Sequence, residues 1–271
     1  KDPGFFTSTK TGFEGEDEWR KADRERGPLG YLQGTTGIGP NNVSVHEERF
    51  PEGGTYQIAT QLDNLCHVGV GPYFYNGNMG PDFASPTGAK RLGMEHVGAF
   101  VTRGILLDVL GYKLKTDTSA VITVNGKPML SDTYRITVAD LQETMRWEGL
   151  KTGVTAGDVV VIRTGWNQLA EDDDTSAKYL AAEPGIYVAE AKFLAANRPA
   201  VIAADSWALE VVGNTSLGAN AFPCHQLLLA RWGIRIGEGV ISDGLAEDGV
   251  HEFVYFYSPM VARGATAGGT P

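Results

Sequence analysis

The sequence lacks several features that would assign it to a membrane or a nucleic acid. It has no run of 18 or more apolar residues and no signal-peptide pattern, so we expect no transmembrane helix and a cytoplasmic location. It also lacks basic patches, and its formal net charge is -10. Nucleic acids and anionic membranes bind basic surfaces, so we expect neither as a partner. A small-molecule substrate is the expected ligand.

Cysteine is scarce. The two cysteines, Cys66 and Cys224, cannot form a disulfide framework, and each directly precedes a histidine. With 271 residues, of which 42% are hydrophobic, the chain is long enough to bury the core of one large domain, although length alone also permits two. No internal repeat is present.

Short apolar runs alternate with helix signals along the chain. Buried strands are predicted at residues 104–109, 158–163 and 200–204, and two more strands at 234–241 and 253–257. Helices are predicted at residues 16–24, 137–148, 184–197 and 225–232. Strands that alternate with helices indicate an α/β domain.

The two ends differ in composition from the rest of the chain. Residues 1–40 are polar and glycine-rich, and we predict an extended N-terminal arm that wraps the surface or a partner subunit. Residues 41–262 form the predicted catalytic domain. The glycine-rich residues 263–271 are predicted to be a flexible tail.

Residues 56–67 carry four polar side chains that can bind a metal or transfer a proton. Gln57, Gln61 and Asp63 all occupy odd positions, so in an extended strand they would point to the same face. A helix would align Gln57 with Gln61 but turn Asp63 away. With His67 close by, the segment predicts an oxygen-rich metal site.

This segment resembles the signature of the cyclase family of metal-dependent hydrolases, which includes kynurenine formamidases and isatin hydrolase. The family pattern runs His-x-Gly-Thr-His-x-Asp-x-x-x-His. Thr60, Asp63 and His67 match it, whereas Gln57 and Gln61 replace two histidines. The glutamine variant is similar to a subgroup that resembles trans-dienelactone hydrolase.

Further segments extend the resemblance over most of the chain. They are Tyr75-Asn76-Gly77, residues 101–104, 157–166 and 204–207, and the pair His225 and Glu238. The resemblance implies a single domain with the swivelling β/β/α-type fold of the cyclase and kynurenine formamidase group. It also implies a homodimer or higher homo-oligomer, with N-terminal residues reaching a neighbouring subunit.

The resemblance implies that Gln57, Gln61 and Asp63 hold a divalent metal ion. Neutral amide oxygens are weaker donors than imidazole, so the site should bind zinc less tightly than its histidine-containing relatives, which favours manganese or another oxygen-preferring ion. Such an ion polarises a carbonyl and lowers the pKa of bound water. His67 is the first choice for moving the proton, and Glu238 is the alternative.

His225 and Glu238 lie thirteen positions apart, on a predicted helix and the strand after it, so both can reach one point. A carboxylate within an apolar strand is costly to bury unless a cation or donor pairs with it, which favours a functional Glu238. In the family the matching residues help hold a second metal or position the water. Without the resemblance, His225 would be interpreted as a structural histidine.

Four aromatic side chains, Tyr73, Tyr75, Trp166 and Trp207, lie beside these motifs and are candidates to line a pocket for a flat ring. Aromatic residues are also common in any core. Asp205 follows a predicted strand directly, where it either takes part in function or caps a turn.

We therefore expect a metal-dependent hydrolase that opens a small cyclic ester, a dienelactone-like lactone, by a metal-activated water. The alternative substrates are a cyclic amide or an N-formyl arylamine. Two other classes stay open: a thiol hydrolase with Cys66 as nucleophile and His225 or His67 as base, and a metal-free binding protein of the same fold. Strand geometry disfavours the thiol hydrolase, because adjacent residues such as Cys66 and His67 point to opposite faces.

Overall fold

The computed structural model describes residues 31–49, 55, 57, 59–171, 173–260 and 262–269. The chain divides into two compact units. The first comprises residues 1–99, 219–235 and 257–271, and the second comprises residues 100–218 and 236–256. Most of the predicted N-terminal arm and the whole helix predicted at 16–24 fall outside the described residues.

A sheet of largely parallel strands forms the centre of the second unit. Its strands follow the order β13 (Glu252–Tyr257), β7 (Phe100–Leu107), β10 (Val159–Ile162), β11 (Val201–Ala204) and β12 (Arg235–Glu238). β10 pairs in parallel with both β7 and β11. Every residue of β10 and β11 is buried, as expected for parallel strands that are covered on both faces.

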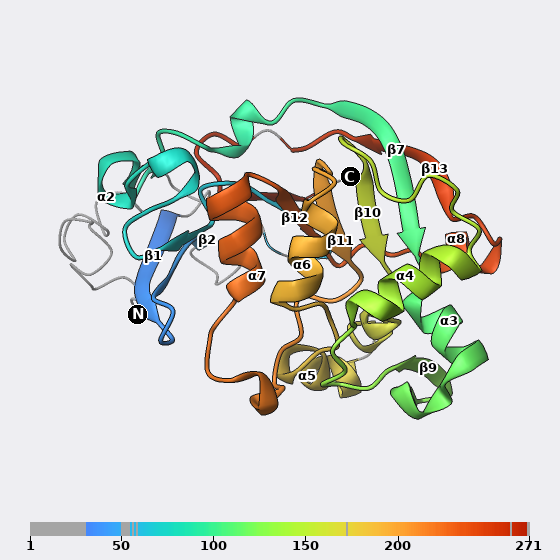
Figure 1. Ribbon diagram of the computed structural model, residues 1–271. Helices are drawn as coiled ribbons and strands as arrows, with labels where there is room; N and C mark the ends of the chain where they lie inside the picture. Colours follow the sequence, from blue (N-terminus) through green and yellow to red (C-terminus); the bar gives the residue numbers. More distant parts are fainter. Residues whose placement is uncertain are drawn as a thin grey trace. The chain divides into compact units, whose positions relative to one another are not determined.

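Helices and one hairpin complete the second unit. They are α3 (Val109–Thr116), α4 (Val138–Trp147), α5 (Asp173–Ala181), α6 (Val188–Ala195), α8 (Asp243–Glu247) and the β8 (Val121–Val124) and β9 (Lys127–Leu130) hairpin. α4 packs against α3, α6 and β7 (Figure 1). Among the helices that the structure describes, none has the length and apolar character needed to cross a membrane.

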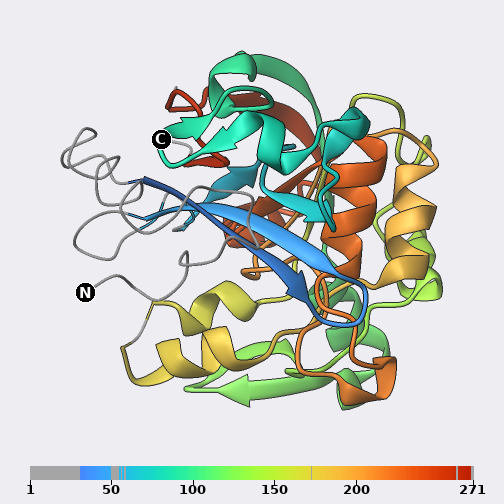
Figure 2. The ribbon, with the colours of Figure 1, turned by 90° about the vertical axis from the view of Figure 1, so that its left-hand side faces the viewer.

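The first unit contains short antiparallel strands. β1 (Tyr31–Ile38), β2 (Val43–Arg49) and β4 (Val68–Val70) form one sheet, and Figure 2 shows β1 and β2 as a long two-stranded ribbon (blue). β3 (Gln61–Asp63) pairs with β14 (Ala267–Gly269). The other elements of the first unit are η3 (Tyr75–Gly77), α2 (Gly80–Phe83), β5 (Ala84–Ser85), β6 (Gly88–Ala89), η4 (Met94–His96), α7 (Pro223–His225) and η8 (Gln226–Trp232).

The mixed α/β class is confirmed, and several elements match their sequence signals. The helix predicted from Thr137 is α4, in which the amide of Asp140 donates to the Thr137 hydroxyl (3.1 Å) and the Asp140 carboxylate accepts from the Thr137 amide (2.8 Å). This capping box satisfies two backbone donors at the start of the helix. The helix predicted at 225–232 ends before Gly233, whose φ of 67° closes it.

Three predicted boundaries are wrong. Residue 109 does not belong to the strand predicted at 104–109, because Asp108 caps α3 by accepting from the amide of Gly111. Helix α6 begins at Val188, not at 184, because the amides of Gly185 and Ile186 donate to the carbonyls of Tyr134 (3.1 Å) and Leu209 (3.3 Å) in isolated β-bridges.

The third boundary is the end of β12, which stops at Glu238 where a strand through residue 241 was predicted. Gly239 follows with a φ of 58°, which is outside the extended region. The predicted flexible tail also contains order: residues 267–269 form β14, and Ala265 and Ala267 are buried.

Candidate metal centre

The segment 56–67 is not one extended strand, so that prediction is wrong. Residues 56 and 58 lie outside the described residues, and Ala59 has a φ of 56°. β3 covers three residues only, and the chain then turns so that the amide of His67 donates to the carbonyl of Asn64 (2.9 Å). The same-face alternation therefore holds for Gln61 and Asp63 alone.

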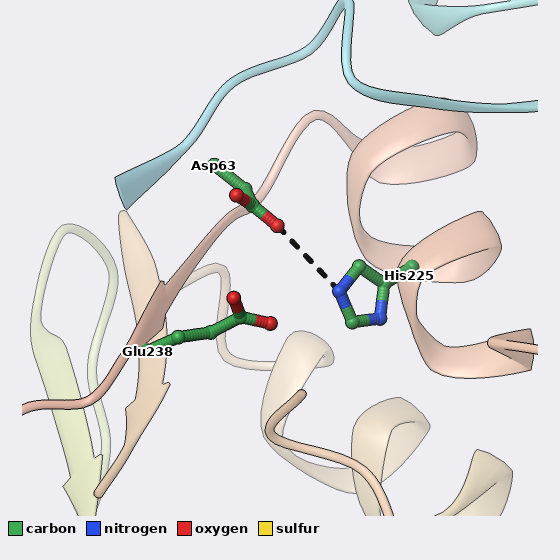
Figure 3. A group of neighbouring side chains, drawn as sticks. All are labelled: Asp63, His225 and Glu238. Atoms are coloured by element: carbon green, nitrogen blue, oxygen red, sulfur yellow. Dashed lines mark ion pairs between the residues drawn. The ribbon is translucent and has the colours of Figure 1, made fainter. Parts of the chain in front are cut away.

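The carboxylate of Asp63 faces two imidazole rings in the first unit. Asp63 is fully buried, and its Oδ2 lies 3.5 Å from His225 Nε2 (Figure 3) and 3.7 Å from His67 Nε2. His67 follows the turn after β3, whereas His225 comes from α7, whose first residue is the helix-starting Pro223. No hydrogen bond from the described residues reaches Oδ2.

These separations fit a shared metal ion better than hydrogen bonds. Two ligand atoms at about 2.0–2.2 Å from an ion, at a tetrahedral angle, are about 3.3–3.6 Å apart. The Asp63 to His225 distance of 3.5 Å falls in this range, whereas the 3.7 Å to His67 lies outside it, so the distances favour Asp63 and His225, and not His67, as the pair that shares an ion. A buried carboxylate oxygen without a donor is also costly unless a cation approaches it.

The hydrogen bond from Nδ1 of His67 to a main-chain oxygen fixes the tautomer of its ring. Its Nδ1 donates to the backbone carbonyl of His46 at 2.6 Å, which leaves the lone pair on Nε2. This contact could not be predicted from residue types, because the acceptor is a main-chain oxygen. The His46 ring is buried and stacks on Phe74, with centroids 4.3 Å apart, and burial lowers its pKa to about 3.

The two glutamines of the motif reach this cluster differently. Gln57 Nε2 lies 2.9 Å from Asp63 Oδ1, and 2.9 Å and 3.2 Å from the two ring nitrogens of His67. Gln61 is buried and shares its strand face with Asp63. The first unit thus brings together five predicted site residues: Gln57, Gln61, Asp63, His67 and His225.

The charge of this cluster follows from its neighbours. Burial alone would raise the pKa of Asp63, but the imidazoles of His67 and His225 and the amide of Gln57 favour the carboxylate, so the pKa lies below its ordinary value. Asp63 is therefore an anionic donor at neutral pH. Together with imidazole nitrogens it forms an N and O donor set, which zinc and manganese both accept.

The acids of the second unit have different roles. Glu238 ends β12 and is buried. Asp205 is also buried, and its carboxylate accepts from the amides of Thr164 (3.0 Å) and Gly165 (2.7 Å), while burial raises its pKa to about 6. Asp205 therefore caps a turn, although the turn follows β10 and not its own strand.

Glu183 is a second buried carboxylate that accepts hydrogen bonds from main-chain amides, and no sequence motif predicted this role. It accepts from the amides of Trp207 (2.8 Å) and Ala208 (2.9 Å), and burial raises its pKa well above the ordinary value. Glu183 and Asp205 thus hold the backbone that follows β11 and β10, respectively. Charged side chains with no local motif gave no indication of this role.

The four predicted aromatic lining residues do not share one environment. Trp166 is fully buried, and its indole donates to the carbonyl of Tyr179 (3.1 Å), so it belongs to the core and offers no surface to a ligand. Tyr73 is 55% exposed, and Tyr75 is half-buried. Trp207 is half-buried in the turn that Glu183 holds.

Cys66 lacks the properties of a nucleophile. It is fully buried among Phe74 and Phe83, and its thiol lies 3.6 Å from the carbonyl of Ala265. Burial raises the pKa of this thiol well above its ordinary value, so the reactive thiolate is disfavoured. The thiol hydrolase alternative has no support from this environment.

Comparison with solved structures identifies proteins of similar fold. A crystal structure described as a novel cyclase has a TM-score of 0.66 and 24% identity, covering 97% of this chain and 92% of the other. Isatin hydrolase A from Ralstonia solanacearum has a TM-score of 0.52 and 15% identity over 83% and 72% of the two chains. An isatin hydrolase bound to the product analogue thioisatinate has a TM-score of 0.51 and 16% identity, covering 92% of each chain.

The sequence itself matches a family description. No curated protein matches the chain. The cyclase family, described as "Putative cyclase", matches residues 41–211, which is more than half of the chain and includes the segment from Gln57 to His67. The chain belongs to the cyclase family.

Proposed function

We propose that this chain is a metal-dependent hydrolase that opens a small cyclic amide. The observation that carries the proposal is the buried Asp63 Oδ2 between the Nε2 atoms of His225 and His67. The likeness in fold to two isatin hydrolases supports a cyclic amide as the first substrate class. The net charge of -10 agrees with a small molecule rather than a nucleic acid.

Asp63 and His225 are the residues we assign to the ion, with the neutral oxygen of Gln61 as a further donor on the same strand face. We propose that Glu238, the buried carboxylate that ends β12, helps to hold a second metal or positions the water, as the family resemblance implies. A bound manganese or zinc ion would polarise the substrate carbonyl and make water more acidic. Asp63 is the one charged residue assigned to this ion, so a bound divalent ion would keep much of its positive charge.

His67 is the residue we assign to proton transfer. Because its Nδ1 proton is donated to the His46 carbonyl, Nε2 is free to accept a proton from the attacking water. The same nitrogen can then protonate the departing amide nitrogen. This second step matters for an amide, because an unprotonated amide nitrogen is a poor leaving group.

A lactone is the second candidate, and the glutamines at positions 57 and 61 favour it. An ester releases an alkoxide or enolate, so it needs less proton donation than an amide. A site with fewer imidazole donors than the family pattern suits the easier reaction.

The assignment of a homodimer or higher homo-oligomer remains a prediction.

A matched panel separates the two substrates. The purified chain would be assayed with isatin, the corresponding cyclic ester, a dienelactone and an N-formyl arylamine, each with added manganese or zinc and after chelation. We expect metal-dependent ring opening with the highest kcat/KM for the cyclic amide. Preference for the lactones would replace the amide assignment, and no hydrolysis of any member would leave a binding protein as the better description.

A further inference from the structure

We infer that Gln57 is a positioning residue that holds Asp63 and His67, and not a ligand of the metal ion. The inference rests on the proposed function, since it concerns the same site. It departs from the simplest reading of the motif, in which Gln57 supplies an amide oxygen to the ion.

The nitrogen end of Gln57 faces Asp63. Nε2 lies 2.9 Å from Asp63 Oδ1, which is a good distance for a charge-assisted hydrogen bond. If the amide were turned over, its oxygen would lie in the same place, 2.9 Å from a carboxylate oxygen, and two acceptors would repel each other. A carboxylate oxygen accepts hydrogen bonds, so the orientation that points the amide N–H at Asp63 Oδ1 is the favourable one.

The same nitrogen lies over the face of the His67 ring. It is 2.9 Å from Nε2 and 3.2 Å from Nδ1. The two ring nitrogens point in diverging directions, so an atom near both lies above the ring and not in its plane. This contact is therefore an N–H to π contact, and it leaves the Nε2 lone pair of His67 free.

Together these contacts fix both partners. Gln57 satisfies Asp63 Oδ1, and this orients Oδ2 toward His225. The His67 ring donates from Nδ1 to the His46 carbonyl, and Gln57 Nε2 lies over its face. These two contacts fix the orientation of the ring and therefore the direction of the lone pair on its Nε2. A neutral amide does this without adding negative charge to the site.

Melting temperatures with and without metal distinguish positioning from ligation. In Gln57→Met the donor is lost while the side-chain length is kept, so Asp63 Oδ1 becomes a buried acceptor without a partner. We expect the melting temperature of the metal-free protein to fall by about 2–6 °C. The rise on adding manganese should stay as large as in the wild type. Gln142→Met, which removes an exposed glutamine of α4, is the control.

The ligand interpretation predicts the reverse pattern. If Gln57 binds the ion, the metal-free protein melts as the wild type does, and the manganese-induced rise shrinks or disappears; this result overturns the inference. Gln57→Glu provides a second test if the Met variant folds poorly. Positioning predicts a larger fall in the metal-free protein, because two carboxylates then face each other, whereas ligation predicts tighter manganese binding.

Kinetics and spectra add a readout that general destabilisation does not change. With cobalt as the probe ion, we expect Gln57→Met to keep the wild-type visible absorption bands while kcat falls about 10–100-fold and KM changes little. Shifted bands would overturn the inference. If the wild-type protein binds no ion at all, the proposed function fails, but the metal-free melting comparison still decides whether Gln57 holds Asp63.

Discussion

Replacement of Asp63 by asparagine tests the metal centre through protein stability. Asp63 is fully buried, and it is the carboxylate that faces both imidazoles in the first unit. Asparagine keeps the shape and can still accept from Gln57 at Oδ1, but it removes the negative charge. We therefore expect folding to survive and metal binding to fail.

The size of the effect follows from binding linkage. An ion present at 100 times its dissociation constant stabilises the folded state by about 2.7 kcal/mol. For a chain of this size that corresponds to a rise in melting temperature of roughly 5–10 °C. The variant should lose this rise, while its metal-free melting temperature stays within about 4 °C of the wild type, because the hydrogen bond from Gln57 is kept.

Thermal unfolding would be recorded for the wild type, Asp63→Asn and the control Asp82→Asn, each after chelation and with added manganese or zinc. Asp82 is an exposed acid of α2, so its variant should behave as the wild type does. An equal metal-induced rise in Asp63→Asn and the wild type would refute the assignment of Asp63 as a ligand.

Two further predictions concern buried groups outside the donor set. Cys66→Ala should retain hydrolysis within about twofold of the wild type, because the thiol is buried and its pKa is raised; a rate loss above a hundredfold would restore the thiol mechanism. Burial raises the pKa of Glu148, which lies 3.2 Å from His251, to about 8. The protonated Glu148 therefore contributes stability that is fully present below the unfolded pKa of about 4.5 and is lost as the pH rises through 8. Urea unfolding at pH 6 and pH 9 should show a smaller pH-dependent loss for Glu148→Gln than for the wild type, and identical losses would count against this cause.

Local sequence signals predicted the second unit well, because its elements depend on near neighbours. The capping box of Thr137 and Asp140 and the β-branched run of β10 both act within a few residues. Two boundaries failed at a local cap and a local turn, at Asp108 and Gly239. The start of α6 failed because a contact distant in the sequence decides it, the hydrogen bond from the amide of Ile186 to the carbonyl of Leu209.

The site was predicted in its residues but not in its geometry. Asp63, His67 and His225 come together as expected from the motif and the resemblance. The strand that was expected to align them is only three residues long, and a turn brings His67 to Asp63 instead. The His46 carbonyl could not be predicted, because a main-chain acceptor leaves no trace in residue identity.

Elemental analysis of the purified wild-type chain beside Asp63→Asn tests the central claim most directly. Both proteins would be supplied with manganese and zinc, freed of excess ion and measured for metal per chain. We predict that each wild-type chain retains at least about one tightly bound ion and that the Asp63→Asn variant retains none. A wild-type chain that retains no metal would contradict the account.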